Sequence, residues 1–145
     1  MGNVVVKAFV VNAENEVLLL HRSGTDTRRP NQWDLPGGWR DKKVGENGEE
    51  IPETVFETAA RECWEEAGLV VSGLREIYET SDETPHGPCT WVAVLAQVEG
   101  RPEVTLGDEH DDCAWVSPTE IPDMIEYHRY KRMAEVVIQD GLLPA

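Results

Sequence analysis

Runs of β-branched and apolar residues divide the chain into short strand-like segments. The first two, Val4 to Val11 and Val17 to His21, are separated by the polar stretch Asn12 to Asn15, so they predict a β-hairpin. Residues 90–98 (TWVAVLAQV) are almost continuously apolar, which is typical of a central strand covered on both faces. Further strands are expected at 69–74, 76–80 and 113–116.

A helical period replaces this pattern in the middle and at the end of the chain. Residues 53–69 predict a helix that ends at Gly68, with a strip of apolar residues about 100° wide facing the core. That strip consists of Phe56, Ala59, Ala60, Cys63 and Ala67. Ser117 to Glu120 has the composition of a capping box and predicts a short helix that stops by Pro122. The last helix is expected over 123–138.

Polar stretches rich in Gly and Pro connect these elements. Loops are expected at 23–31 and 81–88, together with a break in the strands near Gly73. Residues 39–52 are charged, rich in glycine and without a clear period, so we interpret them as a mobile insertion. The order of hairpin, strand, helix, strands and helix predicts an α/β fold with a mixed sheet and helices on both sides.

The other face of helix 53–69 carries three carboxylates, Glu62, Glu65 and Glu66, at positions i, i+3 and i+4. These positions share one face of a helix, where like charges repel one another. In so acidic a chain the simple interpretation is a solvated face. The functional interpretation is a set of hard oxygen ligands for Mg²⁺, with Mn²⁺ as an alternative.

Length and charge narrow the class of protein. A chain of 145 residues fits a single domain over 1–145, in the form of a monomer or a homodimer. With 13 basic against 28 acidic residues its net charge is −15, which argues against nucleic acid and anionic membranes as partners. No segment has the pattern of a signal peptide or a membrane span. Three cysteines without a C-x-x-C pair predict neither disulfides nor a zinc site, and a cytoplasmic location is expected.

The acidic helix is part of a longer motif. Leu35-Pro36-Gly37-Gly38, then Glu53, then Arg61-Glu62-x-x-Glu65-Glu66-x-Gly68-Leu69 resembles the Nudix box of the Nudix hydrolases. The resemblance implies an α/β/α sandwich. The interval 39–52 is longer than in the family pattern, and Pro52 stands where the family usually has glycine. Glu49 and Glu50 are therefore rivals of Glu53.

The resemblance also implies roles for individual residues. The metal ligands would be Glu62, Glu65, Glu66 and, beyond the box, Glu109, with Asp111 and Asp112 as rivals of Glu109. Either Glu109 or Glu62 would be the general base. Among the catalytic candidates, Arg61 would hold a glutamate by a bidentate ion pair.

Other residues are candidates for holding Arg61 or the substrate. Glu53 would be the partner of Arg61 or an outer metal ligand. Gly37 and Gly38 would line the diphosphate site. Arg28, with the adjacent Arg29, is a candidate phosphate contact. Trp39 is a candidate stacking surface at the start of an insertion that we hypothesise to close as a lid.

The resemblance implies Mg²⁺-dependent cleavage of the diphosphate bond in a nucleoside diphosphate linked to another group X. The first interpretation is a nucleoside triphosphate-type pyrophosphohydrolase. The alternatives are a nucleotide-sugar or ADP-ribose-type diphosphatase and a non-catalytic domain that senses a nucleotide. A Ca²⁺-binding or halophilic structural protein, with its loop at 108–112, is disfavoured because the glycine and the distal glutamate of an EF-hand loop are missing.

Overall fold

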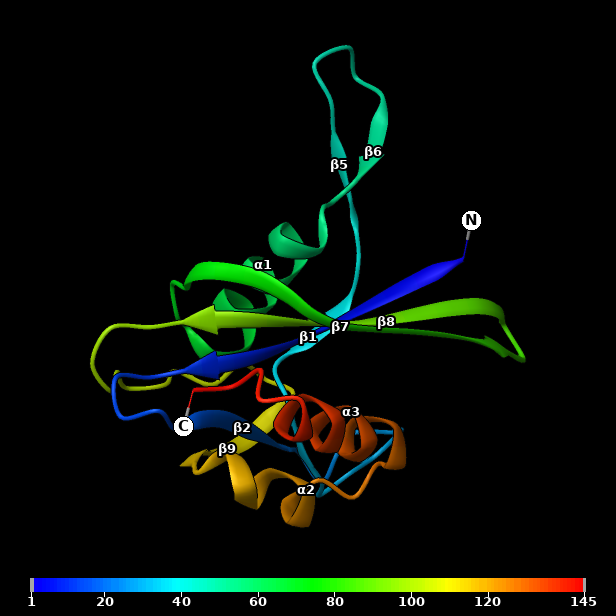
Figure 1. The fold of residues 1–145 in the computed structure, drawn as a ribbon. Helices are drawn as coiled ribbons and strands as arrows, with labels where there is room; N and C mark the ends of the chain where they lie inside the picture. The colour runs from blue at the N-terminus through cyan, green and yellow to red at the C-terminus, as the bar shows by residue number, and fades with distance from the viewer. Residues whose placement is uncertain (1, 145) are drawn as a thin grey trace.

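A computed structural model describes residues 2–144 of the chain. Seven strands form one mixed sheet, and two short strands form a separate hairpin (Figure 1). The sheet consists of β1 (Asn3–Val11), β2 (Val17–Arg22), β3 (Trp33–Asp34), β4 (Gly37–Trp39), β7 (Ser72–Thr84), β8 (Gly87–Gln97) and β9 (His110–Val116). The hairpin consists of β5 (Lys42–Val44) and β6 (Glu50–Pro52), and the helices are α1 (Val55–Ala67), a 3₁₀ turn (Pro118–Glu120), α2 (Ile121–Met124) and α3 (His128–Gln139).

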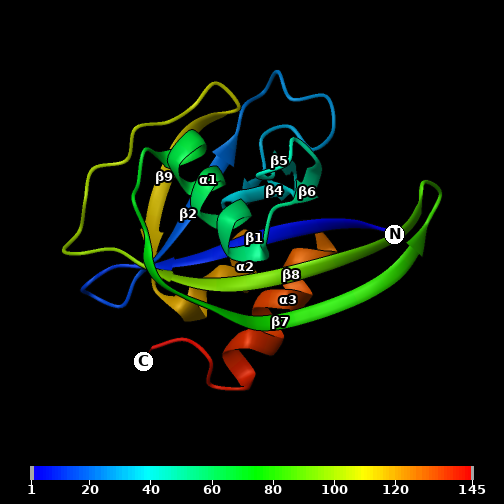
Figure 2. The same cartoon turned by 90° about the horizontal axis from the view of Figure 1, so that it is seen from above.

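Helices cover both faces of the sheet. Helix α1 lies on one face, and α2 and α3 lie on the other (Figures 1 and 2). Alternate residues of β8 divide between the two layers: Trp91 and Leu95 pack in the core beneath α3, whereas Val92 and Val94 face the α1 side. The predicted α/β/α sandwich and the burial of this central strand on both faces are confirmed.

The first two strands form the expected turn but then diverge. Only Val11 and Val17 are paired between β1 and β2. Strand β1 pairs in parallel with β8 along its whole length, and β2 pairs with β9. The turn at Pro36 and Gly37 fits against β1, where the Ala8 amide donates to the Pro36 carbonyl. Gly37 has φ of +149°, and a Cβ atom added there would collide with the Val6 carbonyl oxygen, so this close approach requires glycine.

Two boundaries of the second half of the sheet differ from the sequence prediction. Strand β7 continues through Gly73 without a break, and its register against β8 shifts in this region. The loop expected at 81–88 is mostly strand, because Thr84 pairs with Gly87 and the turn is confined to the two residues between them. A long partner strand stabilised pairing that the local Pro and Gly signals did not predict.

The C-terminal helices also differ from expectation. Ser117 makes no capping hydrogen bond to the backbone, and its hydroxyl contacts that of Thr119 instead. Pro122 lies within the first turn of α2, where its missing N–H costs no hydrogen bond. The predicted 123–138 helix is interrupted, and α3 begins only at His128.

The buried strip of α1 is rotated from the predicted one. Phe56 is 38% exposed, while Thr58 and Glu66 are buried beside Ala59, Cys63 and Ala67. A capping box between Thr54 and Glu57 begins the helix, and Gly68 ends it with φ of +66° as expected. The acidic side of α1 therefore points partly into the protein.

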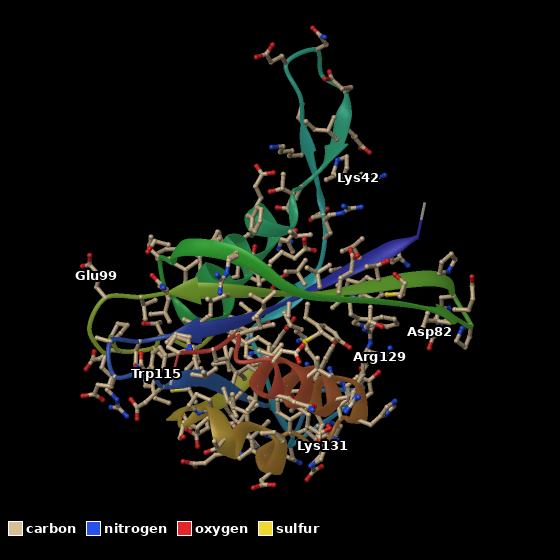
Figure 3. The ribbon with its side chains drawn as sticks, in the orientation of Figure 1. Lys42, Asp82, Glu99, Trp115, Arg129 and Lys131 are labelled. Atoms are coloured by element: carbon tan, nitrogen blue, oxygen red, sulfur yellow. The ribbon has the colours of Figure 1, made fainter. Side chains whose placement is uncertain are left out.

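The insertion is a projecting hairpin closed at its base. Figure 3 shows Lys42 on β5, away from the body of the protein. The Glu53 amide donates to the Asp41 carbonyl at 2.8 Å, and the Asp41 amide donates to Glu53 Oε1 at 3.0 Å. Lys43 pairs with Glu57 on α1 at 2.6 Å. The insertion contains regular structure that its sequence pattern did not predict, since β5 and β6 pair in register.

The carboxylate of Glu53 couples this base to α1. Hydrogen bonds from Arg61 lower the pKa of Glu53 to about 2. Since the folded pKa lies below the unfolded one, this stabilisation is present above about pH 4.5 and is lost as the pH falls towards 2. Glu53→Gln is expected to lower the free energy of unfolding at pH 7 by about 1–3 kcal/mol. The deficit should shrink in acid, as measured by urea unfolding at several pH values.

Glu50→Gln is the matched control for this prediction. Glu50 is an exposed rival of Glu53 and pairs with Lys42 at 3.6 Å. Its loss should change stability by no more than about 0.5 kcal/mol. A deficit for Glu53→Gln that stays constant down to pH 2.5 would contradict the ion-pair explanation.

The tip of the hairpin is expected to be dispensable for stability. Lys42 and Pro52 are opposite partners, so an Asn-Gly turn can replace residues 43–51. The midpoint of thermal unfolding should shift by less than about 3 °C, because the Asp41–Glu53 closure remains. The hairpin residues 42–52 line neither of the two large cavities. We therefore expect the ranking of substrates to be retained, and a changed ranking would support the lid hypothesis instead.

Candidate functional site

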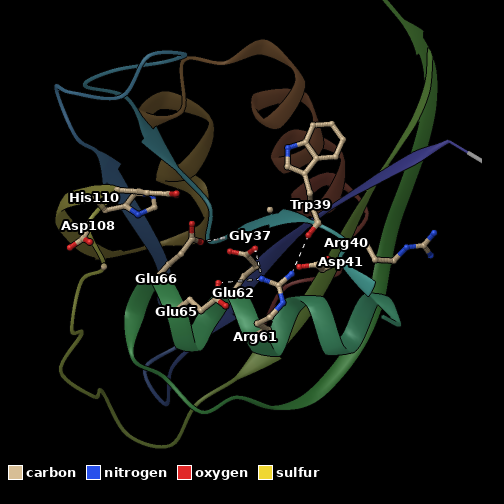
Figure 4. Close-up of a pocket in the computed structure, with 13 residues that line it drawn as sticks. Gly37, Trp39, Arg40, Asp41, Arg61, Glu62, Glu65, Glu66, Asp108 and His110 are labelled. Carbon is tan, nitrogen blue, oxygen red and sulfur yellow. Dashed lines mark hydrogen bonds and ion pairs between the residues drawn. The ribbon is translucent and has the colours of Figure 1, made fainter. Parts of the chain in front are cut away.

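Three glutamates of α1 border a cavity of about 600 Å³ (Figure 4). Its opposite walls are the glycine turn before the hairpin and the loop before β9. The residues around it are Gly37, Gly38, Trp39, Arg40, Asp41, Arg61, Glu62, Glu65, Glu66, Gly107, Asp108, Glu109 and His110. The structure thus brings together nearly all the candidates from the box, although the hairpin lies between them in sequence.

Glu66 is the most buried carboxylate of the site, with 9% of its surface exposed. The amide of Gly37 donates to its Oε1 at 2.8 Å. Burial raises its pKa to about 8, although the charge of Lys7 acts in the opposite direction. A carboxylate in this position favours a cation beside it. The simple interpretation of a solvated face does not apply to Glu66, because the helix is rotated towards the sheet.

Glu62 lies between Arg61 and the glycine turn. Burial raises its pKa, and the adjacent Arg61 counteracts part of the shift. A Cβ atom added to Gly38 would lie 2.6 Å from Glu62 Oε1. Glycine at 38 therefore allows the turn to approach this carboxylate closely.

Arg61 binds the surrounding acceptors through all its N–H groups. It donates to both oxygens of Glu53, at 2.9 and 3.0 Å. Further bonds reach Glu62 at 3.0 Å, Glu65 at 3.2 Å and the Trp39 carbonyl at 3.2 Å. The carboxylates raise the pKa of Arg61, so it stays charged. Glu49, a rival of Glu53, accepts from Asn47 within the hairpin.

The donor set suits a hard divalent cation, but the carboxylates are not arranged around one. Among residues 2–144, no three His, Cys, Asp or Glu side chains are close enough to hold a metal ion as they stand. Glu62 and Glu65 each direct an oxygen to Arg61. The buried Glu66 and the oxygen-only chemistry fit Mg²⁺ or Mn²⁺, provided that Glu62 and Glu65 turn from Arg61.

The loop before β9 supplies the opposite wall. Its Gly107 amide donates to the Glu66 carbonyl, which joins the loop to the end of α1. Glu109 is exposed and borders both large cavities. Its rivals have other contacts: Asp111 lies 2.6 Å from His21, and Asp112 accepts the Cys113 amide.

Two neighbours of Glu109 were missed by the sequence analysis. Asp108 and His110 line the same cavity. Burial lowers the pKa of His110 to about 4, so its imidazole is neutral at pH 7. Their adjacency to Glu109 was the available signal, but the sequence does not tell which side chains of an acidic loop turn inward.

A second cavity of about 500 Å³ adjoins the first, and the sequence analysis missed most of it. Arg28 lies there as a candidate contact, and Trp39 borders both cavities. Arg29 lies there too, and the residues not predicted from the sequence include Lys7, Arg22, Trp91, Tyr127 and Tyr130. A lysine within the apolar run of β1 was the available signal, since a buried lysine needs a partner.

The comparisons with known proteins agree with this geometry. The NUDIX domain family matches residues 1–136. No curated protein sequence matches the chain at a significant level. None of the helices within residues 2–144 is both long and apolar enough to cross a membrane.

Solved structures with the same fold include several Nudix proteins. The MutT protein of Methanosarcina mazei Go1 is 26% identical, with a TM-score of 0.71 over 95% of this chain and 94% of that one. An Ap4A hydrolase of C. elegans is 20% identical, with a TM-score of 0.68 over 95% and 98% of the two chains. The NUDIX domain of Shewanella oneidensis NrtR, solved with ADP ribose, is 16% identical, with a TM-score of 0.66 over 95% and 89%. The family match and the fold together show that this chain belongs to the Nudix family and is a pyrophosphate-bond hydrolase.

Proposed function

We propose that this protein is a Mg²⁺-dependent hydrolase that cleaves the diphosphate bond of a nucleoside diphosphate linked to another group, with nucleoside triphosphates as the first substrate class. The observation that supports this proposal is the single cavity between the carboxylates of α1 and the loop of Glu109. Glu62, Glu65, Glu66 and Glu109 would hold the metal. When bound, Mg²⁺ supplies a positive charge that neutralises the phosphate oxygens as water attacks.

Glu109 is the better placed candidate for the general base. Its side chain is exposed at the junction of the two cavities and, within residues 2–144, makes no hydrogen bond or ion pair. Its oxygens are therefore available to accept the proton of a water molecule. The rival base Glu62 has an oxygen engaged by Arg61 at 3.0 Å. For Glu62 to act, that ion pair must first be broken.

The glycine turn and Trp39 provide contacts for the rest of the substrate. The close packing of Gly37 and Gly38 leaves backbone rather than side chains at the cavity wall. The indole of Trp39 is 47% exposed, which offers a surface on which a nucleobase can stack. Arg61 acts as a positioning residue, because its N–H groups hold Glu53, Glu62 and Glu65.

An ADP-ribose or nucleotide-sugar diphosphatase is the second candidate function. The second cavity leaves room for a group X larger than a phosphate. The NrtR domain, which has the same fold, was solved with ADP ribose. Hydrolysis of a panel of nucleoside triphosphates, dinucleotides and nucleotide sugars with Mg²⁺ separates the two functions, and absence of turnover on all of them would favour a sensing domain.

Glu66→Gln tests the role of the buried carboxylate. The rate should fall by about 10³-fold or more, because the charge that would hold the metal is removed. The folded pKa of about 8 lies above the unfolded one, so the charged carboxyl destabilises the fold increasingly as the pH rises from about 4.5 to 8. In EDTA at pH 8.5 the variant should unfold at the same or a higher temperature than the wild type. Near-normal turnover would disprove the assignment.

The control for this variant is Glu135→Gln. Glu135 is exposed on α3 and lies outside both cavities, so the same change of charge should leave turnover unaltered. Isothermal calorimetry should detect Mg²⁺ binding to the control, and weaker binding to Glu66→Gln.

Glu109→Ala tests the base. If Glu109 accepts the proton of water, kcat should fall by about 10²–10⁴-fold with little change in KM. Asp112→Ala is the control, because the side chain of Asp112 accepts the next amide of β9 and lines neither cavity. A change in KM alone would indicate that Glu109 binds the substrate and that Glu62 is the general base.

A further inference from the structure

The second cavity contains an unusual concentration of positive charge. Lys7, Arg22, Arg28 and Arg29 lie along it, in a chain whose net charge is −15. The side chains of Lys7, Arg22 and Arg29 are only 5%, 14% and 20% exposed. Desolvated cations of this kind need anionic partners.

Two carboxylates form direct ion pairs with these cations. One oxygen of the buried Asp34 accepts from Lys7 and Arg22 at 3.2 Å and from Arg29 at 3.3 Å. Asp26 adds a second carboxylate, 2.6 Å from Arg22. Three buried or half-buried cations thus share two ion-paired carboxylates, and the exposed Arg28 adds a further positive charge at the rim. Glu66 and Glu109 also border the cavity, but neither forms an ion pair with these cations among residues 2–144.

Three aromatic rings of the cavity, those of Trp91, Tyr127 and Tyr130, are already in contact with cations. The guanidinium of Arg29 lies 4.4 Å from the ring centre of Tyr127 and 5.3 Å from that of Tyr130. Arg129 covers Trp91 at 3.6 Å. These contacts fix the guanidinium of Arg29 and occupy ring faces that a nucleobase would need. Away from Trp39, positive charge rather than free aromatic surface is therefore what this cavity offers a ligand.

A ligand can occupy both cavities at once. Gly37, Gly38, Trp39, Glu66 and Glu109 border the carboxylate cavity and the cationic one. A substrate with its diphosphate beside Glu66 can therefore extend past the glycine turn to the arginines.

We propose that the second cavity binds a second phosphate group of the substrate, separated from the cleaved diphosphate. This inference rests on the proposed function, and it restricts the substrate to nucleotides that carry such an additional phosphate on the nucleoside or on the group X. Arg29 and Arg28 supply charged N–H donors to the phosphate, and Lys7 and Arg22 contribute the surrounding positive potential.

Binding of paired ligands without a diphosphate bond tests the inference separately from hydrolysis. Calorimetry with Mg²⁺ compares adenosine 5′-monophosphate with adenosine 2′,5′- and 3′,5′-bisphosphate, and ribose 5-phosphate with ribose 1,5-bisphosphate. At least one bisphosphate should bind about tenfold or more tightly than its monophosphate, since tenfold is within the range of one charge-assisted contact. The pair that shows the advantage identifies which side of the substrate carries the phosphate.

Arg29→Gln should reduce this advantage to less than about threefold. The variant retains Lys7 and Arg22 as partners of Asp34, which favours folding. Arg28→Gln, at the exposed rim, is a second variant for the same binding measurement and leaves the buried cluster unchanged. The matched control is Arg132→Gln, exposed on α3 outside both cavities.

The outcomes are distinct. Loss of the advantage in Arg29→Gln or Arg28→Gln, with retention in Arg132→Gln, supports the phosphate site. Equal binding of every pair by the wild type, or an advantage that survives in both cavity variants, overturns it. An enzyme that hydrolyses diphosphates but shows no bisphosphate advantage refutes this inference alone, whereas a bisphosphate advantage without hydrolysis refutes the proposed function alone.

Discussion

The site depends on the hydrogen bonds and ion pairs of the Arg61 guanidinium. Three carboxylates on one side of a helix repel one another, and folding brings Glu53 close to them. Arg61 forms five hydrogen bonds that reach Glu53, Glu62, Glu65 and the Trp39 carbonyl. A single cation therefore connects the helix, the glycine turn and the end of the hairpin. The same bonds keep Glu62 and Glu65 away from the arrangement that a metal ion requires, so metal and Arg61 compete for their oxygens.

Charge is distributed differently on the two sides of the glycine turn. On the α1 side, burial raises the pKa of Glu66 to about 8, even though Lys7 acts in the opposite direction. On the other side, Lys7, Arg22 and Arg29 crowd around Asp34. The turn at Gly37 and Gly38 lies between them and borders both cavities. The protein thus has a carboxylate-lined cavity that suits a cation, next to a cationic cavity that suits an anion. This pair of cavities matches a ligand made of a metal ion and phosphates.

The divergence of β1 and β2 makes this arrangement possible. Because the two strands share one residue pair and then take different partners, β4 can pair with β1 close to α1. Gly37 and Gly38 permit that approach, the first through its positive φ and the second through the absence of a side chain beside Glu62. The hairpin leaves the body just after this turn and returns at Glu53, so its length does not disturb the site.

The sequence alone determined the family resemblance, the α/β/α class and the helix that carries Glu62, Glu65 and Glu66. These features follow from local patterns: the helical period, the Gly68 stop and the spacing of charged residues. The candidates Arg61, Glu53, Gly37 and Gly38 also came from the motif, and Glu109 came from the resemblance beyond it. All of them except Glu53 line one cavity, and Glu53 is joined to it through Arg61.

Only the tertiary structure decided which way the side chains face. The rotation of α1 buries Glu66 and exposes Phe56. In β9, Asp111 contacts His21 and Asp112 accepts the next amide, and neither lines a cavity. The cluster of Lys7, Arg22, Arg29 and Asp34 combines β1, β2, the loop after β2 and β3, so no local spacing could predict it. Long-range pairing likewise extended β7 through residues that favour a turn. The reason is physical: hydrogen-bond partners and burial depend on segments far apart in the chain, whereas sequence patterns report only near neighbours.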